Sequence, residues 1–266
     1  MIQFPRILLP ALLGAAVVGH AAGLPDTGQD TCYTDTVAIA DSATHIFSVA
    51  RDTANYPRQD CRYGRDPMTS AGLLRKTGTG YSGFDYTKIA NNGTELPSNS
   101  VLGSANTEWA CTRDNTTGLT WEVKTFANLS LRYVDHKYQW YSTDGNTNGG
   151  NVGILGANSC ASTLPGGNCN TQAYTTAVNG AALCTYTDWR LPTQRELLTL
   201  VYANGFNPAV DWIFLPATAG GYYWSATTYV GGPQTAWVVD FATGSLRLTD
   251  KTTFPYHIRL VRGGPF

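Results

Sequence analysis

Charged residues are scarce in this chain of 266 residues. Aspartate, glutamate, lysine and arginine together make up 14% of the sequence, where soluble domains usually carry about 25%. The formal net charge is only −1. Proteins that bind nucleic acid present a basic patch or stripe, and this composition gives no such excess of positive charge. We therefore expect no nucleic-acid partner.

Long apolar runs are also lacking, apart from one near the N-terminus. Residues 7–19 are almost entirely apolar, Arg6 precedes them, and small residues follow up to Gly23. A helix that spans a membrane takes about 20 apolar residues, so this run is short for that role. A positive charge, a short apolar stretch and small residues are typical of a secretory signal peptide. We predict such a peptide over residues 1–22, export to the periplasm, the cell surface or the medium, and no transmembrane segment once it is removed.

No two cysteines form a Cys-x-x-Cys pair, which removes support for a zinc ribbon or a thioredoxin-like motif. All six cysteines follow the predicted signal peptide, and an even number in an exported chain indicates disulfides. The sequence alone leaves the pairing open. One close pair flanks a Pro-Gly-Gly loop that can double back, and two others lie together in the N-terminal region. On this basis we expect the pairs Cys160–Cys169, Cys32–Cys61 and Cys111–Cys184.

Two regions of the chain differ in their patterning. Residues 23–105 are rich in turn signals and have only short apolar runs, which predicts an irregular N-terminal region packed on a larger domain. The larger domain is expected over residues 106–266, where the periodicity is sharper. Residues 119–123 alternate as a strand does. Asn170 or Thr171 can cap a helix that runs to about Ala182.

A second helix has the strongest local signal. Thr193 and Glu196 have the spacing of a capping box, in which the hydroxyl and the carboxylate each accept a hydrogen bond from a backbone N–H at the helix start. Glu196 is therefore interpreted as a helix cap and not as a catalytic acid. Trp189, just before this helix, and Trp224 are expected in the core.

The rest of the chain predicts antiparallel strands with one inward and one outward face. The expected inward set is Trp237, Val239, Phe241, Leu246, Leu248, Ile258 and Leu260. The same parity directs Arg247, His257 and Arg259 outward, with Lys251 in the turn between the last two strands. Four basic or titratable groups on one face could bind an anionic sugar, because arginine presents a planar fork to sulfate or carboxylate. The alternative is an ordinary solvated face balanced by neighbouring aspartates.

One loop offers a candidate calcium site. Asp144, Asn146 and Asn148 alternate and Gly149 follows, as in the first half of a calcium-binding loop, where oxygen ligands alternate and glycine allows a sharp turn. The twelfth position of such a loop is Leu155 rather than glutamate. The alternative is a polar turn, in which asparagine and glycine tolerate left-handed geometry. We expect no obligatory cofactor, and calcium is the one candidate.

Several short motifs follow one another along the chain. They are Leu24–Gln29, Trp109–Glu122, Asn168–Tyr174, Asp188–Thr193, Tyr223–Ser225 and Arg259–Arg262. This succession resembles the Lcl C-terminal domain family, which is named for a bacterial collagen-like adhesin, from about residue 109 to residue 262. The resemblance implies an α+β fold of the C-type-lectin-like type, with two helices packed on short twisted antiparallel sheets, many loops and disulfides.

Formylglycine-generating oxidases share this broad fold and a similar Arg-Leu-Pro-Thr segment. They hold copper with a late pair of cysteines, since thiolates bind this soft metal, but here no cysteine follows Cys184. We therefore expect no enzyme. The family's named member implies a non-catalytic recognition or adhesion domain that binds a carbohydrate or another envelope component. A structural envelope or surface-filament component without a small ligand is the alternative, and an oxidase relative is the third option.

Overall fold

The structure, a computed structural model, describes residues 26–28, 31–33, 38–40, 59–60, 64–65, 68, 72–73, 75–156 and 159–264. The predicted signal peptide and Cys61, one half of the predicted Cys32–Cys61 disulfide, lie outside the described residues. Within the described part of the chain, no helix is both long and apolar enough to cross a membrane.

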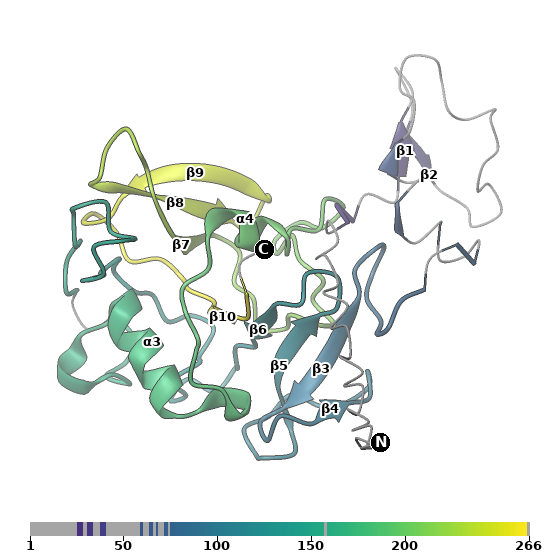
Figure 1. Cartoon of the computed structure of the whole chain (residues 1–266), viewed down its shortest axis with the longest axis horizontal. Helices are drawn as coiled ribbons and strands as arrows, with labels where there is room; N and C mark the ends of the chain where they lie inside the picture. Colours follow the sequence, from purple (N-terminus) through teal and green to yellow (C-terminus); the bar gives the residue numbers. More distant parts are fainter. Residues whose placement is uncertain are drawn as a thin grey trace, which may run out of the picture.

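The fold is α+β, and its strands pair in antiparallel fashion in three sheets (Figure 1). The five-stranded sheet has the order β10–β6–β5–β3–β4 and consists of β3 (Tyr86–Ala90), β4 (Glu95–Leu96), β5 (Trp109–Asp114), β6 (Thr120–Glu122) and β10 (Val261–Arg262). The three-stranded sheet has the order β7–β8–β9 and consists of β7 (Tyr222–Thr228), β8 (Thr235–Asp240) and β9 (Ser245–Asp250). Strands β1 (Thr31–Tyr33) and β2 (Ala38–Ala40) form a separate pair.

Strands β3 and β4 come from the region that the sequence predicted to be irregular. Strand β3 lies between β4 and β5, and Lys88 is opposite both Leu96 of β4 and Thr112 of β5. Tyr86, Thr87 and Ile89 are aromatic or β-branched residues that suit a pleated surface. The main sheet therefore begins well before residue 106.

Two α-helices lie between residues 159 and 264, α3 (Thr171–Gly180) and α4 (Gln194–Leu198). Asn170 caps α3, because its side-chain oxygen accepts a hydrogen bond from the backbone N–H of Ala173 at 2.8 Å. Thr193 and Glu196 form the predicted capping box of α4, with both reciprocal hydrogen bonds present. Short 3₁₀ turns, η3 (Pro165–Gly167) and η4 (Leu183–Thr185), flank α3.

Two disulfides brace this framework. Cys111 of β5 is bonded to Cys184 of η4, which fixes the segment after α3 to the five-stranded sheet. Cys160 is bonded to Cys169 and closes the loop before α3. Both are pairs that the sequence led us to expect, and such links stabilise a fold mainly by restricting the unfolded chain.

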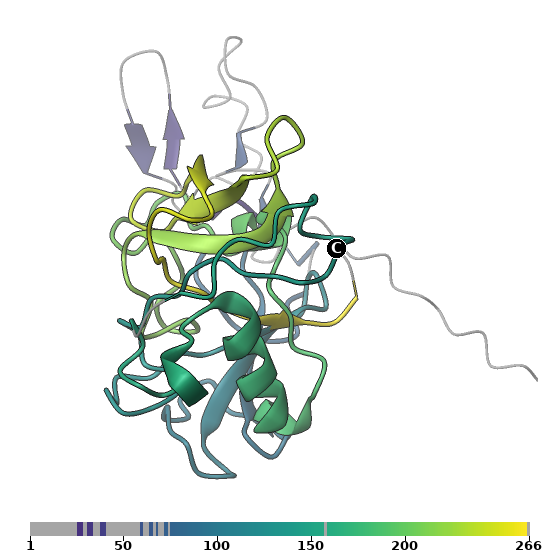
Figure 2. The ribbon, with the colours of Figure 1, turned by 90° about the vertical axis from the view of Figure 1, so that its left-hand side faces the viewer.

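The three-stranded sheet is covered on both faces, which the sequence did not predict. Trp224 and Val238 on one face pack into a core cluster with Tyr138 and Trp140. The opposite face contributes Tyr223, Val239 and Phe241 to a second cluster that includes Leu197 and Leu200 beside α4. Figures 1 and 2 show α3 apart from the three-stranded sheet, with loop segments between the two.

The predicted inward set is therefore only partly right. Trp189 and Trp224 are buried as expected, but Trp237 is half-buried. Leu246 and Leu248 are 37% and 41% exposed, because β9 is the edge of its sheet and α4 covers β7 and β8 instead. The prediction assumed that only one face of each strand is buried, and this assumption fails where both faces of a strand are covered.

Candidate functional site

The four residues of the predicted basic face do not form an exposed surface, because three of them are buried. Arg247 is exposed on β9, whereas Lys251, His257 and Arg259 are 0%, 7% and 0% exposed. Residues 257–261 are buried, because His257 forms backbone hydrogen bonds with β7 and Val261 pairs with both β6 and Arg190. The prediction of a four-residue anion site is wrong for this reason.

Arg259 and its neighbours form a buried charge cluster instead. The Glu122 carboxylate accepts hydrogen bonds from Lys124 Nζ and the Leu260 N–H, both at 2.9 Å, and from the Tyr174 hydroxyl of α3. Arg259 donates to the Glu122 carbonyl oxygen. Burial lowers the pKa of Lys124 to about 8, although Glu122 opposes this shift. Shifted pKa values often mark functional sites, but these side chains are at most 3% exposed and anchor α3 to the sheet.

Lys251, which follows β9, contacts the loop that resembled a calcium site. Its ammonium group donates to the carbonyl oxygens of Asn148 (2.8 Å) and Asn151 (3.1 Å). The same group lies 3.8 Å from the centre of the Trp140 ring, which is the geometry of a cation–π contact. A lysine cation thus already satisfies the carbonyl oxygens on the inner side of this loop.

The side chains of the candidate calcium ligands are engaged within the loop. Asp144 Oδ1 accepts from the backbone and side-chain N–H groups of Asn146, both at 3.0 Å, and Asp144 Oδ2 accepts from Thr147. Asn148 donates to Ser142 and accepts from Gly150. The hydrogen bond from the Asn146 backbone lowers the pKa of Asp144. These contacts are those of a polar turn, the alternative that the sequence left open.

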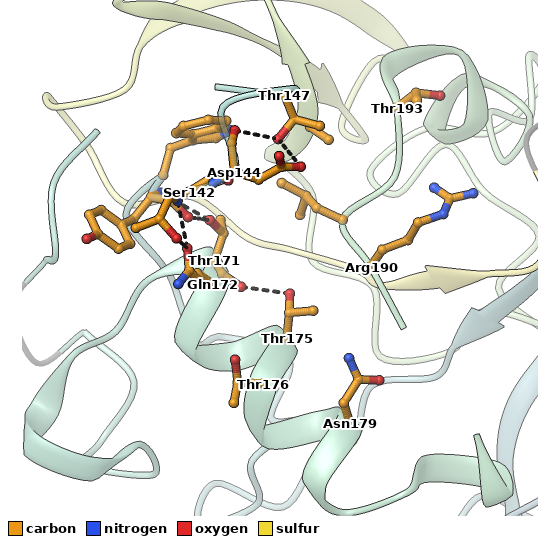
Figure 3. Close-up of a pocket in the computed structure, with 15 residues that line it drawn as sticks. Ser142, Asp144, Thr147, Thr171, Gln172, Thr175, Thr176, Asn179, Arg190 and Thr193 are labelled. Carbon is orange, nitrogen blue, oxygen red and sulfur yellow. Dashed lines mark hydrogen bonds between the residues drawn. The ribbon is translucent and has the colours of Figure 1, made fainter. Parts of the chain in front are cut away.

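A hollow of about 600 Å³ lies beside this loop (Figure 3). This volume is within the roughly 300–1,000 Å³ of small-molecule sites. Three segments form its walls, namely residues 140–147 of the loop, one face of α3, and residues 190–193 before α4, and Ala226 of β7 also lines it. In Figure 3 the side chains of Thr175, Thr176 and Asn179 project from α3 on one side, and Asp144 and Thr147 lie across from them.

Strand β7 is bonded to two of the three walls, the loop and the segment before α4. Trp140 donates its indole N–H to the carbonyl oxygen of Ser225 at 2.9 Å, and Thr228 donates to the carbonyl oxygen of Thr147 at 2.8 Å. Ala226 donates its N–H to the carbonyl oxygen of Pro192 at 2.7 Å. The hollow is therefore a preformed feature of the fold and not a gap between free loops.

The start of α3 is fixed to the loop wall by a strand-like ladder. Gln139 bonds to Cys169 and Thr171 through backbone groups, and the Thr171 hydroxyl bridges both backbone groups of Tyr141. Gln172 Oε1 accepts from the N–H and the hydroxyl of Thr143. This leaves the side-chain N–H₂ of Gln172 without a protein partner among the described residues.

The charges of the hollow are few. Arg190 lines it, but its guanidinium forms two hydrogen bonds to Glu196, at 2.9 and 2.6 Å, and in Figure 3 it points away from α3. The Asn179 amide is likewise engaged, with both backbone groups of Trp189. Asp144 is the one lining residue whose charge has no ionic partner among the residues that the structure describes. The remaining lining is made of hydroxyl, amide and aromatic groups, which suit a neutral polar ligand.

The sequence analysis missed the α3 face of this hollow, although a signal was present. From Gly145 to Thr187 the chain has no aspartate, glutamate, lysine or arginine. A solvated helix face normally carries charge, so a face of threonine, glutamine and asparagine is unusual. The described chain thus contains an α+β fold with a polar hollow of few charges beside α3, the longer of its two described α-helices.

Comparison with models of known families identifies the family of this chain. The chain belongs to the Lcl C-terminal domain family, whose model matches residues 110–262. All three walls of the hollow lie inside the matched range. No curated protein shows a significant match to the chain.

Proposed function

We propose that this protein is an exported, non-catalytic recognition domain of C-type-lectin-like architecture that binds a carbohydrate in the hollow between α3 and residues 140–147. The observation that carries the proposal is the lining itself, which combines hydroxyl and amide groups with the half-buried side chains of Tyr141 and Leu191. Sugars are recognised by such mixtures, because their hydroxyl groups need hydrogen bonds while their ring faces are apolar. The membership of an adhesin-named family agrees with this proposal.

The lining also favours binding over catalysis. Most glycoside hydrolases need two carboxyl groups that flank the bond to be cleaved. The hollow offers Asp144, whose pKa is lowered by the Asn146 N–H, so that it stays ionised and is a poor proton donor at neutral pH. Glu196, which pairs with the lining residue Arg190, is not itself in the lining and also accepts a hydrogen bond from the Thr193 N–H. We propose that the protein is not an enzyme.

We further propose that ligand binding needs no calcium. The carbonyl oxygens of Asn148 and Asn151 bond to Lys251, and the Asp144 carboxylate is engaged by its own turn. Export fits the two disulfides, since these persist in oxidising compartments. A carbohydrate of the cell envelope or of a neighbouring cell is therefore the proposed partner.

A glycan array probed with the protein tests the proposal. Wild type should bind a defined set of saccharides, with and without a calcium chelator. Thr175→Phe, which places a ring in the hollow, should abolish that binding, whereas Thr107→Phe at an exposed turn should not. Equal binding by wild type and Thr175→Phe would move the site elsewhere. Absence of binding to every saccharide would favour the structural envelope component.

A further inference from the structure

A second hollow adjoins the first. It has a volume of about 340 Å³ and shares three lining residues with the first hollow, Tyr141, Gln172 and Thr176. Leu155, Pro165, Asn168, Asn170, Ala173 and Ala177 complete it. The two hollows therefore meet at these three shared side chains, which we call the ridge. We call the two hollows together the groove.

The ridge carries polar groups that form no hydrogen bond with the described residues. The hydroxyl groups of Tyr141 and Thr176 and the side-chain N–H₂ of Gln172 have no hydrogen-bond partner among the described residues. Tyr141 is half-buried, and Gln172 and Thr176 are exposed. A ligand that crosses the ridge meets donors and acceptors there, and this is what the link between two sugar rings requires.

The wall of the second hollow is fixed by covalent and hydrogen bonds. Asn170 donates its side-chain N–H to the carbonyl oxygen of Leu155 at 2.9 Å while its oxygen caps α3. The Cys160–Cys169 disulfide closes the loop that carries Pro165 and Asn168. Preorganised walls lose little conformational freedom when a ligand binds, so this hollow is suited to contribute affinity.

The chemistry of the second hollow differs from that of the first. Leu155, Pro165, Ala173 and Ala177 give it an apolar wall without a charged residue. The exposed side-chain amide of Asn168 has no hydrogen bond to the described protein. An apolar wall beside a free amide matches an acetamido group, whose methyl needs an apolar contact and whose N–H and C=O pair with an amide.

We propose that the two hollows are adjoining subsites for a neutral, linear saccharide of at least two units that carries acetamido groups. The first hollow takes one sugar ring, the ridge contacts the linkage, and the second hollow takes an acetamido group of the next unit. Sulfated or uronic saccharides are disfavoured, because the cation of Arg190 is engaged by Glu196 and Asp144 repels anions. This inference rests on the proposed function and names its ligand class.

Titration calorimetry with N-acetylglucosamine and with its β-1,4-linked dimer and tetramer tests the inference. The dimer and the tetramer should bind on the order of tenfold more tightly than the monomer, because linked units engage both subsites. Glucose oligomers of equal length and linkage should lose that gain. Heparin-type oligosaccharides should bind more weakly than the acetamido oligomers.

Two variants separate the subsites. Asn168→Leu should remove the gain in affinity with length, whereas Asn106→Leu, at an exposed turn outside the groove, should change the affinity for neither the monomer nor the tetramer. Equal affinity for monomer and tetramer in wild type would overturn the two-subsite inference and leave the proposed function standing. Glucose oligomers or heparin fragments that match the acetamido oligomers would overturn the ligand class. Failure of every saccharide to bind would overturn the proposed function as well.

Discussion

At the scale of single residues, Lys251 shows how this chain arranges its loop without a metal ion. Its side chain is fully buried, its ammonium group bonds to two loop carbonyl oxygens, and the Trp140 ring lies beneath it. Burying a charge is costly unless it is paired or hydrogen-bonded. The contacts offset that cost and fix the loop wall of the groove.

Lys251→Met should therefore loosen this wall. The loss of one cation–π contact and of the donor to two carbonyl oxygens should lower the free energy of unfolding by about 2–4 kcal/mol. Amide hydrogen exchange should rise over residues 147–151, and added calcium should not reverse it. Lys137→Met, at an exposed lysine, is the matched control. Unchanged loop protection in Lys251→Met would contradict the role assigned to this side chain.

Glu196 is the second residue with a clear physical consequence. Burial alone would raise its pKa, but hydrogen bonds from Arg190 and from the Thr193 N–H lower the pKa below the ordinary value of 4.5. A carboxyl group with a lowered pKa in the folded state contributes stability above its unfolded pKa. That contribution is lost as the pH falls through the folded pKa.

Glu196→Gln should accordingly lower the free energy of unfolding at pH 7 by about 2–3 kcal/mol. Below pH 4.5 the difference from wild type should shrink, because wild type then loses the same contribution. Urea unfolding across this pH range provides the measurement. Glu95→Gln removes an exposed ion pair with Arg113 and should cost at most about 1 kcal/mol. A difference that stays constant down to pH 3 would contradict this account.

At the scale of elements, the three-stranded sheet is the part whose packing matters most for the groove. Strand β7 is bonded to the loop wall and to the segment before α4. Its Trp224 is fully buried, and the indole N–H donates to the carbonyl oxygen of Tyr138. Trp237 lies on β8 opposite Leu248 of the edge strand and is half-buried. The two tryptophans should therefore differ in their contribution to stability.

Trp224→Ala should cost about 3–5 kcal/mol of stability, the range for large core side chains. Trp237→Ala should cost about 1–2 kcal/mol, because less apolar area leaves water at that position. Urea unfolding of both variants gives the comparison. Equal losses would show that the packing assigned to β8 is incorrect.

At the scale of the whole molecule, the sequence predicted what depends on neighbours along the chain. The Asn170 cap, the Thr193–Glu196 capping box and the disulfide of Cys160 with Cys169 span at most 9 residues. The α+β class followed from the resemblance and from the periodicity of the strands.

Most features that depend on distant partners could not be predicted; the Cys111–Cys184 disulfide, which joins residues 73 positions apart, is the exception because the other pairings left it over. Lys251 bonds to a residue 103 positions away, and Arg259 bonds to one 137 positions away. Without knowledge of these partners, both side chains were interpreted as surface charges. The alternation of inward and outward residues then assigned them to an exposed face, but the fold buries them. The groove escaped prediction for the same reason, since its walls come from separate segments that contact one another only in the folded chain.

The claim that the α3 hollow is the ligand site is tested most directly by NMR. Backbone amide shifts should be followed while a saccharide found on the glycan array is titrated into the protein. The account predicts that the shifted amides gather in residues 139–148, 168–179 and 190–193, and that Thr175→Phe removes these shifts. Shifts that centre on β9 and Arg247, with residues 168–179 unchanged, would contradict it.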